Sequence, residues 1–193
     1  MLSLSQRQQW LIAVCLLILM LITRGHHFAS VSALPSASWA VFFLAGFYLS
    51  SRWSFPALLG LAATLDLSAI FWGGVSSYCV SPAYGFLLPA YGSLWLVGRW
   101  YATKHQFSWT TLIPLVGSVI TAAAMATVFS SGGFYWFSGR YTDPTFIEFG
   151  QRFVQYFPKY LSTLSFYVAV AAVMHCAFRF SHPGQQTEQH KQS

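Results

Sequence analysis

The chain has 193 residues, of which 55% are hydrophobic, 19% are aromatic and only 7% are charged. A soluble domain carries roughly 25% charged residues, so this composition excludes a water-soluble globule. It also excludes an intrinsically disordered chain, which needs low hydrophobicity and high charge. We therefore expect an integral membrane protein. Its formal net charge of +6 then concerns orientation and anionic lipid headgroups, and we expect no nucleic acid partner.

Six apolar stretches follow one another along the chain, and a spanning helix needs about 20 such residues. In chain order the predicted helices cover residues 4–23, 36–51, 55–75, 82–98, 110–129 and 154–178. The strict alternation of a membrane barrel is absent, which leaves helices as the way to satisfy backbone polar groups in lipid. The sequence thus predicts an all-α membrane domain of six helices, with residues 1–193 forming a single unit in the lipid bilayer.

The longest predicted connection covers residues 130–153, and it is expected to be an outer loop. It carries Phe134, Tyr135, Trp136, Phe137, Tyr141, Phe146, Phe149 and Phe153. Aromatic side chains at a membrane interface serve as anchors, but so many on one loop could also cover a large, flat, partly apolar ligand. A polar tail at residues 179–193 closes the chain.

The distribution of positive charge predicts the orientation of the six helices. The side that holds both termini carries Arg7, Arg52, Arg99, Lys104, Arg179 and Lys191, and the opposite side carries Arg24, Arg140, Arg152 and Lys159. Because cytoplasmic segments are enriched in lysine and arginine, we expect both termini in the cytoplasm.

Five chemically capable side chains from separate segments are then predicted to end near the outer face. They are His27, Asp66, Cys79, Tyr84 and Arg152. Asp66 is the only acidic residue inside a predicted helix, and an intramembrane carboxylate indicates function by default. The alternative is that it is a structural partner for an arginine or a tyrosine. The shared depth of the five residues predicts a ligand pocket that opens outward.

The residues alone leave several chemical roles open for Cys79. A lone cysteine cannot build a zinc site, which takes three or four protein ligands. It could be an inert thiol, a nucleophile with His27 as its base, or an axial ligand to a metal whose other positions a macrocycle fills. Cys15 and Cys176 lie inside apolar stretches, where a free cysteine behaves as a small hydrophobic residue.

The sequence Tyr-Cys-Val-Ser-Pro-Ala-Tyr at residues 78–84, with Asp66 before it and Arg152 ahead of the last predicted helix, resembles the BtuM family. These small membrane proteins are related to the substrate-binding S-components of energy-coupling-factor (ECF) vitamin transporters, and they take up cobalamin. The resemblance covers essentially the whole chain. It implies a monomeric cobalamin transporter of the bacterial inner membrane, in which Cys79 ligates the cobalt.

The resemblance also implies roles for the residues around that ligand. Cys79 is expected where the dimethylbenzimidazole base of cobalamin would otherwise sit, and its electron-rich thiolate implies removal of an upper cyanide as a further, catalytic reaction. Asp66 and Tyr84 are expected to hydrogen-bond corrin amides or to orient the cysteine. Arg152 and His27 are expected to bind the phosphate of the nucleotide loop or amide carbonyls.

Two features of the sequence differ from those of an ATP-driven ECF transporter. The chain contains no G-x-x-x-x-G-K-[ST] motif and therefore no ATPase of its own. S-components usually carry Ala-x-x-x-Ala on the first helix to dock on the ECF coupling subunit, whereas here Ala13 is followed by Leu17. That departure fits a solitary S-component.

Two other classes of protein stay open from the residues alone. One is a membrane redox or haem protein that uses Cys79 or a histidine as an axial ligand. The other is a small scaffold protein in which Asp66 fixes helix packing. Against the haem protein, His175 is the only histidine inside a predicted helix.

Overall fold

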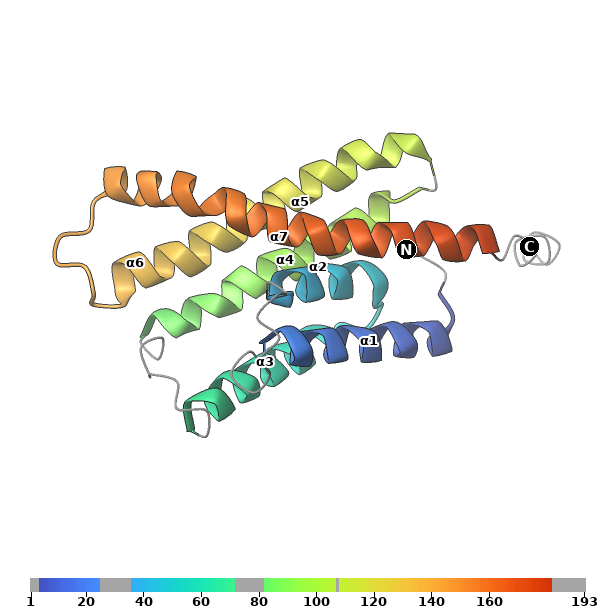
Figure 1. The fold of residues 1–193 in the computed structure, drawn as a ribbon, viewed down its shortest axis with the longest axis horizontal. Coiled ribbons are helices and arrows are strands. Elements are labelled where there is room, and N and C mark those ends of the chain that lie inside the picture. Colours follow the sequence, from blue (N-terminus) through green and yellow to red (C-terminus); the bar gives the residue numbers. More distant parts are fainter. Residues whose placement is uncertain (1–3, 25–35, 72–81, 107, 182–193) are drawn as a thin grey trace.

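The computed structural model describes residues 4–24, 36–71, 82–106 and 108–181 (Figure 1). In chain order its elements are α1 (Gln6–Arg24), α2 (Ser38–Tyr48), α3 (Ser54–Phe71), the 3₁₀ helix η2 (Pro82–Phe86), α4 (Leu87–Lys104), the 3₁₀ helix η3 (Trp109–Thr111), α5 (Leu112–Thr127), the π-helix η4 (Val128–Gly132), α6 (Gly133–Phe137) and α7 (Phe146–Ser181). All regular structure within these ranges is helical. The predicted all-α class is therefore confirmed.

Four helical stretches are long and apolar enough to cross a membrane. They are α1, α3, the continuous run Leu112–Phe137, and Phe146–Phe178 of α7. Large apolar side chains such as Trp10, Ile113 and Val173 are exposed on their outer faces, which suits lipid better than water. The structure is thus compatible with a multi-pass membrane protein. Since α2 has only 11 residues and α4 falls outside the spanning set, the count of six spans stays a prediction.

The short helix α2 lies at the centre of the bundle. It packs against α1, α3, α4 and α7, and Phe42 and Phe43 are among its fully buried side chains. A helix that is apolar on all sides is typical of a position with no solvent-facing surface. The hydrophobic core is therefore organised around α2, with α1, α3, α4 and α7 packed against it.

Two glycines allow α2 and α4 to cross at very short range. A Cβ atom added to Gly46 would overlap the carbonyl of Trp95, and one added to Gly98 would overlap the carbonyl of Phe43. Small residues at membrane helix interfaces let backbones approach closely. The position of α4 against the core therefore depends on these two glycines.

Replacing one of these glycines should weaken the bundle. We expect Gly98→Ala to lower the free energy of unfolding by about 1–3 kcal/mol, because the added methyl group must push α2 and α4 apart. Gly117→Ala on α5 is the matched control, since the space around Gly117 is open. Thermal unfolding in detergent would measure both variants. Equal stability of the two variants would contradict the close crossing.

The prediction of one long outer loop at residues 130–153 is wrong for most of its length. The helix of α5 continues through η4 and α6 to Phe137, and α7 already begins at Phe146. Only residues 138–145 form an irregular connection, which turns at Gly139 with a φ of 70°, a conformation that glycine adopts without steric cost. The last predicted helix accordingly begins eight residues earlier than expected.

The two ends of the bundle differ in what they contain. α1 begins and α7 ends at the same end (Figure 1). We call this the proximal end, and we call the opposite end, where α1 and α3 finish and α4 and α7 begin, the distal end. Because the first helix begins and the last helix ends at the same end, the chain crosses the bundle an even number of times.

Candidate functional site

The carboxylate of Asp66 binds three hydrogen-bond donors near the distal end of α3. Arg24, the last residue of α1, donates from Nε to Oδ1 at 2.7 Å and from Nη2 to Oδ2 at 2.6 Å. Tyr84 of η2 donates its hydroxyl to Oδ2 at 2.8 Å. The side chains of Arg24 and Asp66 are only 14% and 25% exposed. Two parallel bonds of this kind form the strongest arginine–carboxylate geometry.

The remaining guanidinium nitrogen of Arg24 extends this network to two further helices. Nη1 donates to the hydroxyl of Ser38 on α2 and to the hydroxyl of Tyr91 on α4, both at 2.8 Å. We call these five residues the Asp66 cluster. One positive and one negative charge balance within it, and its hydrogen bonds join α1, α2, α3, η2 and α4 at the distal end.

The structure brings two of the five sequence-predicted residues together, since Tyr84 donates directly to Asp66. His27 and Cys79 lie outside the described residues. Along the chain, however, Asp66 and Tyr84 flank the segment 72–81 that contains Cys79, and Arg24 immediately precedes the segment 25–35 that contains His27. Three residues of the Asp66 cluster thus lie close in sequence to these two segments.

Arg152 belongs to a separate network on α7, so it is not the structural partner of Asp66. Its Nε and Nη2 donate to Oε1 of Glu148 at 3.1 Å and 2.9 Å. The other oxygen of Glu148 accepts the hydroxyl of Tyr135 at 2.9 Å. That hydroxyl in turn accepts the backbone N–H of Thr145 at 3.0 Å. Glu148 therefore links the guanidinium of Arg152 to Tyr135 of α6, and the hydroxyl of Tyr135 also holds the residue just before α7.

A hollow of about 320 Å³ surrounds Arg152. We call it the Arg152 pocket; its lining residues are Ser130, Ser131, Phe134, Tyr135, Tyr141, Phe149, Arg152, Tyr156 and Tyr160. The guanidinium carbon of Arg152 lies 4.7 Å from the ring centre of Tyr141 and 5.7 Å from that of Tyr135. Cations are attracted to aromatic faces at such distances, so the aromatic walls help to hold the guanidinium.

The Asp66 cluster and the Arg152 pocket are joined through η2. Phe86 of η2 stacks on Phe137 of α6 with ring centres 4.8 Å apart, and it lies directly against Gly133. α6 also carries Tyr135, a wall of the Arg152 pocket, while η2 carries Tyr84 of the Asp66 cluster. The two sites therefore lie on neighbouring elements of the distal end.

Sequence reasoning missed Arg24 and Glu148. A lone carboxylate inside a membrane protein requires a cation at the same depth, and Arg24 at the end of the first apolar stretch meets that condition. Glu148 and Arg152 have the i,i+4 spacing of a helical ion pair. That signal becomes visible only once residues 146–153 are recognised as helix.

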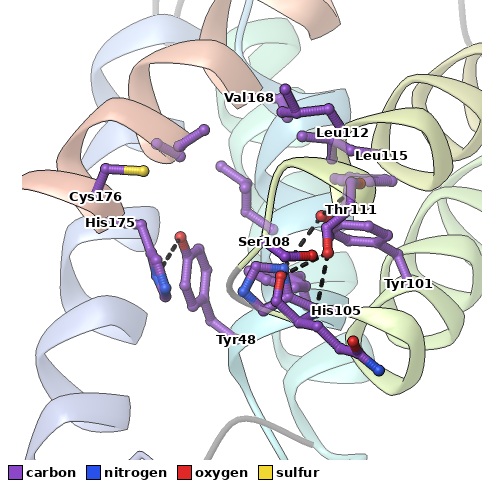
Figure 2. Close-up of a pocket in the computed structure, with 16 residues that line it drawn as sticks. Tyr48, Tyr101, His105, Ser108, Thr111, Leu112, Leu115, Val168, His175 and Cys176 are labelled. Atoms are coloured by element: carbon purple, nitrogen blue, oxygen red, sulfur yellow. Dashed lines mark hydrogen bonds between the residues drawn. The ribbon is translucent and has the colours of Figure 1, made fainter. Parts of the chain in front are cut away.

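A second and larger cavity, of about 410 Å³, lies at the proximal end and is lined mostly by apolar side chains. Figure 2 shows Tyr48 and His175 on one side of it and His105 on the other. The two histidine rings meet edge to face with centres 5.6 Å apart. The hydroxyl of Tyr48 lies 3.4 Å from Nδ1 of His175, and that of Tyr101 lies 3.2 Å from Nδ1 of His105.

This histidine pair was not expected, because His105 lies outside every predicted helix. It is remote from the Asp66 cluster: Tyr91 and Tyr101 are ten residues apart on α4, which corresponds to about 15 Å of helix. The pair therefore brings no histidine to the residues that flank Cys79. Among the described residues, no group of three histidine, cysteine, aspartate or glutamate side chains could hold a metal ion.

Taken together, the distal end offers hydrogen-bond donors, the guanidinium groups of Arg24 and Arg152, and flat aromatic walls. Such a surface suits recognition of a large ligand that carries amides and an anionic group. A scan of protein-family models and a search of curated proteins find no match to the chain. The function must therefore be inferred from the residues and their geometry.

Proposed function

We propose that the protein binds cobalamin at the distal end and mediates its uptake across the bacterial inner membrane, with Cys79 as the ligand of cobalt. The observation that carries this proposal is the hydrogen bond from Tyr84 to Asp66 at 2.8 Å. It links the helix that precedes the Cys79 segment to the element that follows it. A soft thiolate suits cobalt, whose remaining positions the corrin ring fills.

The Asp66 cluster can contact the corrin amides without being rearranged. A carboxylate has about four lone-pair positions, and the side chain of Asp66 accepts three hydrogen bonds. The hydroxyl oxygen of Tyr84, which donates to Asp66, can itself still accept an amide N–H. Both residues therefore remain available as acceptors for a ligand at the distal end.

The axial thiolate also has a chemical consequence for cyanocobalamin. A strongly donating ligand on one face of cobalt weakens the bond to the ligand on the other face. When the Cys79 sulfur binds, cyanide leaves with its bonding electron pair and cobalt stays in its oxidation state. We propose this decyanation as a reaction that accompanies binding, with Cys79 as the residue responsible.

Cobalamin binding can be measured directly. The purified protein is titrated with hydroxocobalamin by isothermal titration calorimetry, and we expect saturation at one site. Cys15→Ser, which changes a thiol on α1, should bind identically. Absence of a saturable heat in both proteins would rule out the proposed function.

Uptake requires the distal end to face the periplasm. A topology reporter fused after Ser193 should report the cytoplasm, and one inserted at Gly139, in the connection between α6 and α7, should report the periplasm. The charge distribution gives this expectation through the enrichment of cations in cytoplasmic segments. The reverse result would place the Asp66 cluster on the wrong side for uptake.

A further inference from the structure

The cavity at the proximal end, which we call the proximal cavity, has a polar mouth and an apolar interior. Gln106 and Ser108 line it at the connection between α4 and α5, and both residues are exposed. Leu115 and Val168 line it along α5 and α7, within stretches that are long and apolar enough to cross a membrane. A ligand of this cavity therefore has a polar part at the helix ends and an apolar part between the two helices.

The proximal cavity also reaches the outer surface of the bundle. Leu112 at the start of α5 and Cys176 near the end of α7 both line it and are both exposed. The neighbouring outer faces carry exposed apolar side chains such as Ile113 and Val173, which suit contact with lipid. A molecule dissolved in the membrane can therefore enter the cavity between α5 and α7.

The charge and the size of the proximal cavity restrict its ligand. Among the described residues that line it, none is a lysine, arginine, aspartate or glutamate. A charged ligand would therefore lose its hydration without gaining a fixed counter-ion, which is costly in apolar surroundings. The volume of about 410 Å³ lies within the range of small-molecule sites and is too small for a whole corrinoid. The ligand is thus a small uncharged molecule and not cobalamin.

Aromatic rings form one wall of the cavity. The ring of Phe47 lies with its centre 4.6 Å from that of Tyr48, and 5.2 Å from those of both Tyr101 and His105. Aromatic rings pack favourably in stacked and edge-to-face arrangements. This wall therefore favours a ligand whose polar part is itself a flat ring.

Two tyrosine hydroxyls supply the hydrogen bonds at this wall (Figure 2). The hydroxyl of Tyr48 lies 3.4 Å from Nδ1 of His175. The hydroxyl of Tyr101 lies 3.2 Å from Nδ1 of His105 and 3.5 Å from the carbonyl oxygen of Thr111. These distances exceed the roughly 2.7–3.0 Å of a well-formed hydrogen bond. Since a hydroxyl has one donor and two acceptor positions, each can form a shorter bond to a ligand oxygen.

We propose that the proximal cavity binds a lipid-soluble quinone. The hydroxyl of Tyr48 donates to a carbonyl oxygen of the quinone, the flat ring packs against the wall around Phe47, and the apolar tail lies between α5 and α7. Quinones combine the properties that the cavity selects, because they are uncharged, carry their oxygen atoms on a flat ring and dissolve in the membrane. Binding at this end is independent of the proposed cobalamin site at the distal end.

The test compares three membrane-soluble probes on the full chain in lipid nanodiscs, by calorimetry with the heat of empty nanodiscs subtracted. Decylubiquinone should saturate one site. 1-Dodecanol keeps a tail and a hydroxyl but has no flat ring, and dodecanoate adds a negative charge, so both should bind at least about tenfold more weakly. Absence of saturable binding of decylubiquinone would overturn the proposal. Binding of either other probe as tight as that of decylubiquinone would do the same.

Substitutions then locate the site. Ala172→Leu places a larger side chain in the lining of the cavity and should weaken decylubiquinone binding about tenfold or more. Ala169→Leu is the matched control, because Ala169 is exposed on α7 and lies outside the lining; its affinity should equal that of the wild type. Equal affinities of these two variants would show that the quinone binds elsewhere.

Tyr48→Phe removes one oxygen atom and keeps the ring, so it tests the hydrogen bond without disturbing the packing. It should weaken decylubiquinone binding about three- to tenfold, as for the loss of one hydrogen bond. Thermal unfolding without quinone would show that each variant is folded. Unchanged affinity of Tyr48→Phe would overturn the assigned contact, whatever the result for Ala172→Leu.

Discussion

Asp66→Asn and Arg24→Gln should each lower the free energy of unfolding of the ligand-free protein by about 2–4 kcal/mol. Each substitution leaves the partner's charge in place without its counter-ion, and the expected cost lies between those for exposed and for fully buried ion pairs. Thermal unfolding in detergent would measure both variants. The bidentate contact and the low exposure of the two side chains are the reasons for a large effect.

The double variant Asp66→Asn/Arg24→Gln tests whether the loss comes from the pair itself. With both charges removed, we expect stability to recover part of the way toward the wild type, because no uncompensated charge remains. Glu148→Gln is the matched control, since the Glu148–Arg152 pair is more exposed and should contribute less to stability than the Arg24–Asp66 pair does. Single variants as stable as the wild type would contradict the Asp66 cluster.

The same variants show whether Asp66 also serves the ligand. A ligand at about 100 times its dissociation constant stabilises a protein by roughly 2.7 kcal/mol. We expect hydroxocobalamin to stabilise Asp66→Asn less than it stabilises the wild type, because one acceptor for the corrin amides is altered. Equal stabilisation by the ligand would restrict Asp66 to a structural role.

Cys79→Ser should abolish transport and change the spectrum of bound cobalamin. Serine is nearly the size of cysteine, but its hydroxyl is a hard and poorly ionised donor, so the corrin site should persist without ligation of cobalt by sulfur. Affinity should therefore fall less than the rate of uptake does. Absorption spectra of the complexes and uptake of labelled cobalamin would measure the two effects.

The other two cysteines provide the controls for this substitution. Cys15→Ser and Cys176→Ala should leave the spectrum of bound cobalamin unchanged, since both residues lie within apolar stretches of α1 and α7, where a free cysteine behaves as a small hydrophobic residue. After incubation with cyanocobalamin, the wild type should yield a corrinoid without cyanide, and Cys79→Ala should return cyanocobalamin. An unchanged spectrum in Cys79→Ser, or equal conversion by both proteins, would show that Cys79 does not ligate cobalt.

The fold class could be predicted from the sequence because lipid leaves few ways to satisfy backbone polar groups. The end of the fifth predicted helix could not, since Ser130, Ser131, Gly132 and Gly133 are typical of a helix end. In the structure the π-helix η4 takes up most of this stretch, and the helix continues to Phe137. Its packing against η2 and α4 outweighs the local preference.

The sequence predicts the depth in the membrane at which the candidate-site residues lie, but not which of these residues pair with one another. Position along the chain shows that Asp66, Tyr84 and Arg152 lie near one end of the bundle, yet it does not show which helices are neighbours. Arg24 could therefore not be recognised as the partner of Asp66, although only one helix, α2, separates the two helices that carry these residues. The pairing of His105 with His175 was missed for the same reason, because it depends on how α4 and α7 approach each other at the proximal end.

The absorption spectrum of the protein purified from cells grown with cobalamin tests the central claim most directly. Cobalt bound to the Cys79 sulfur predicts that the wild type carries a corrinoid spectrum through purification, and that this spectrum differs from that of free cobalamin. The same preparation of Cys79→Ala should lack the difference. A Soret band would identify a haem protein instead, and a colourless protein that takes up no cobalamin on addition would contradict the proposed function.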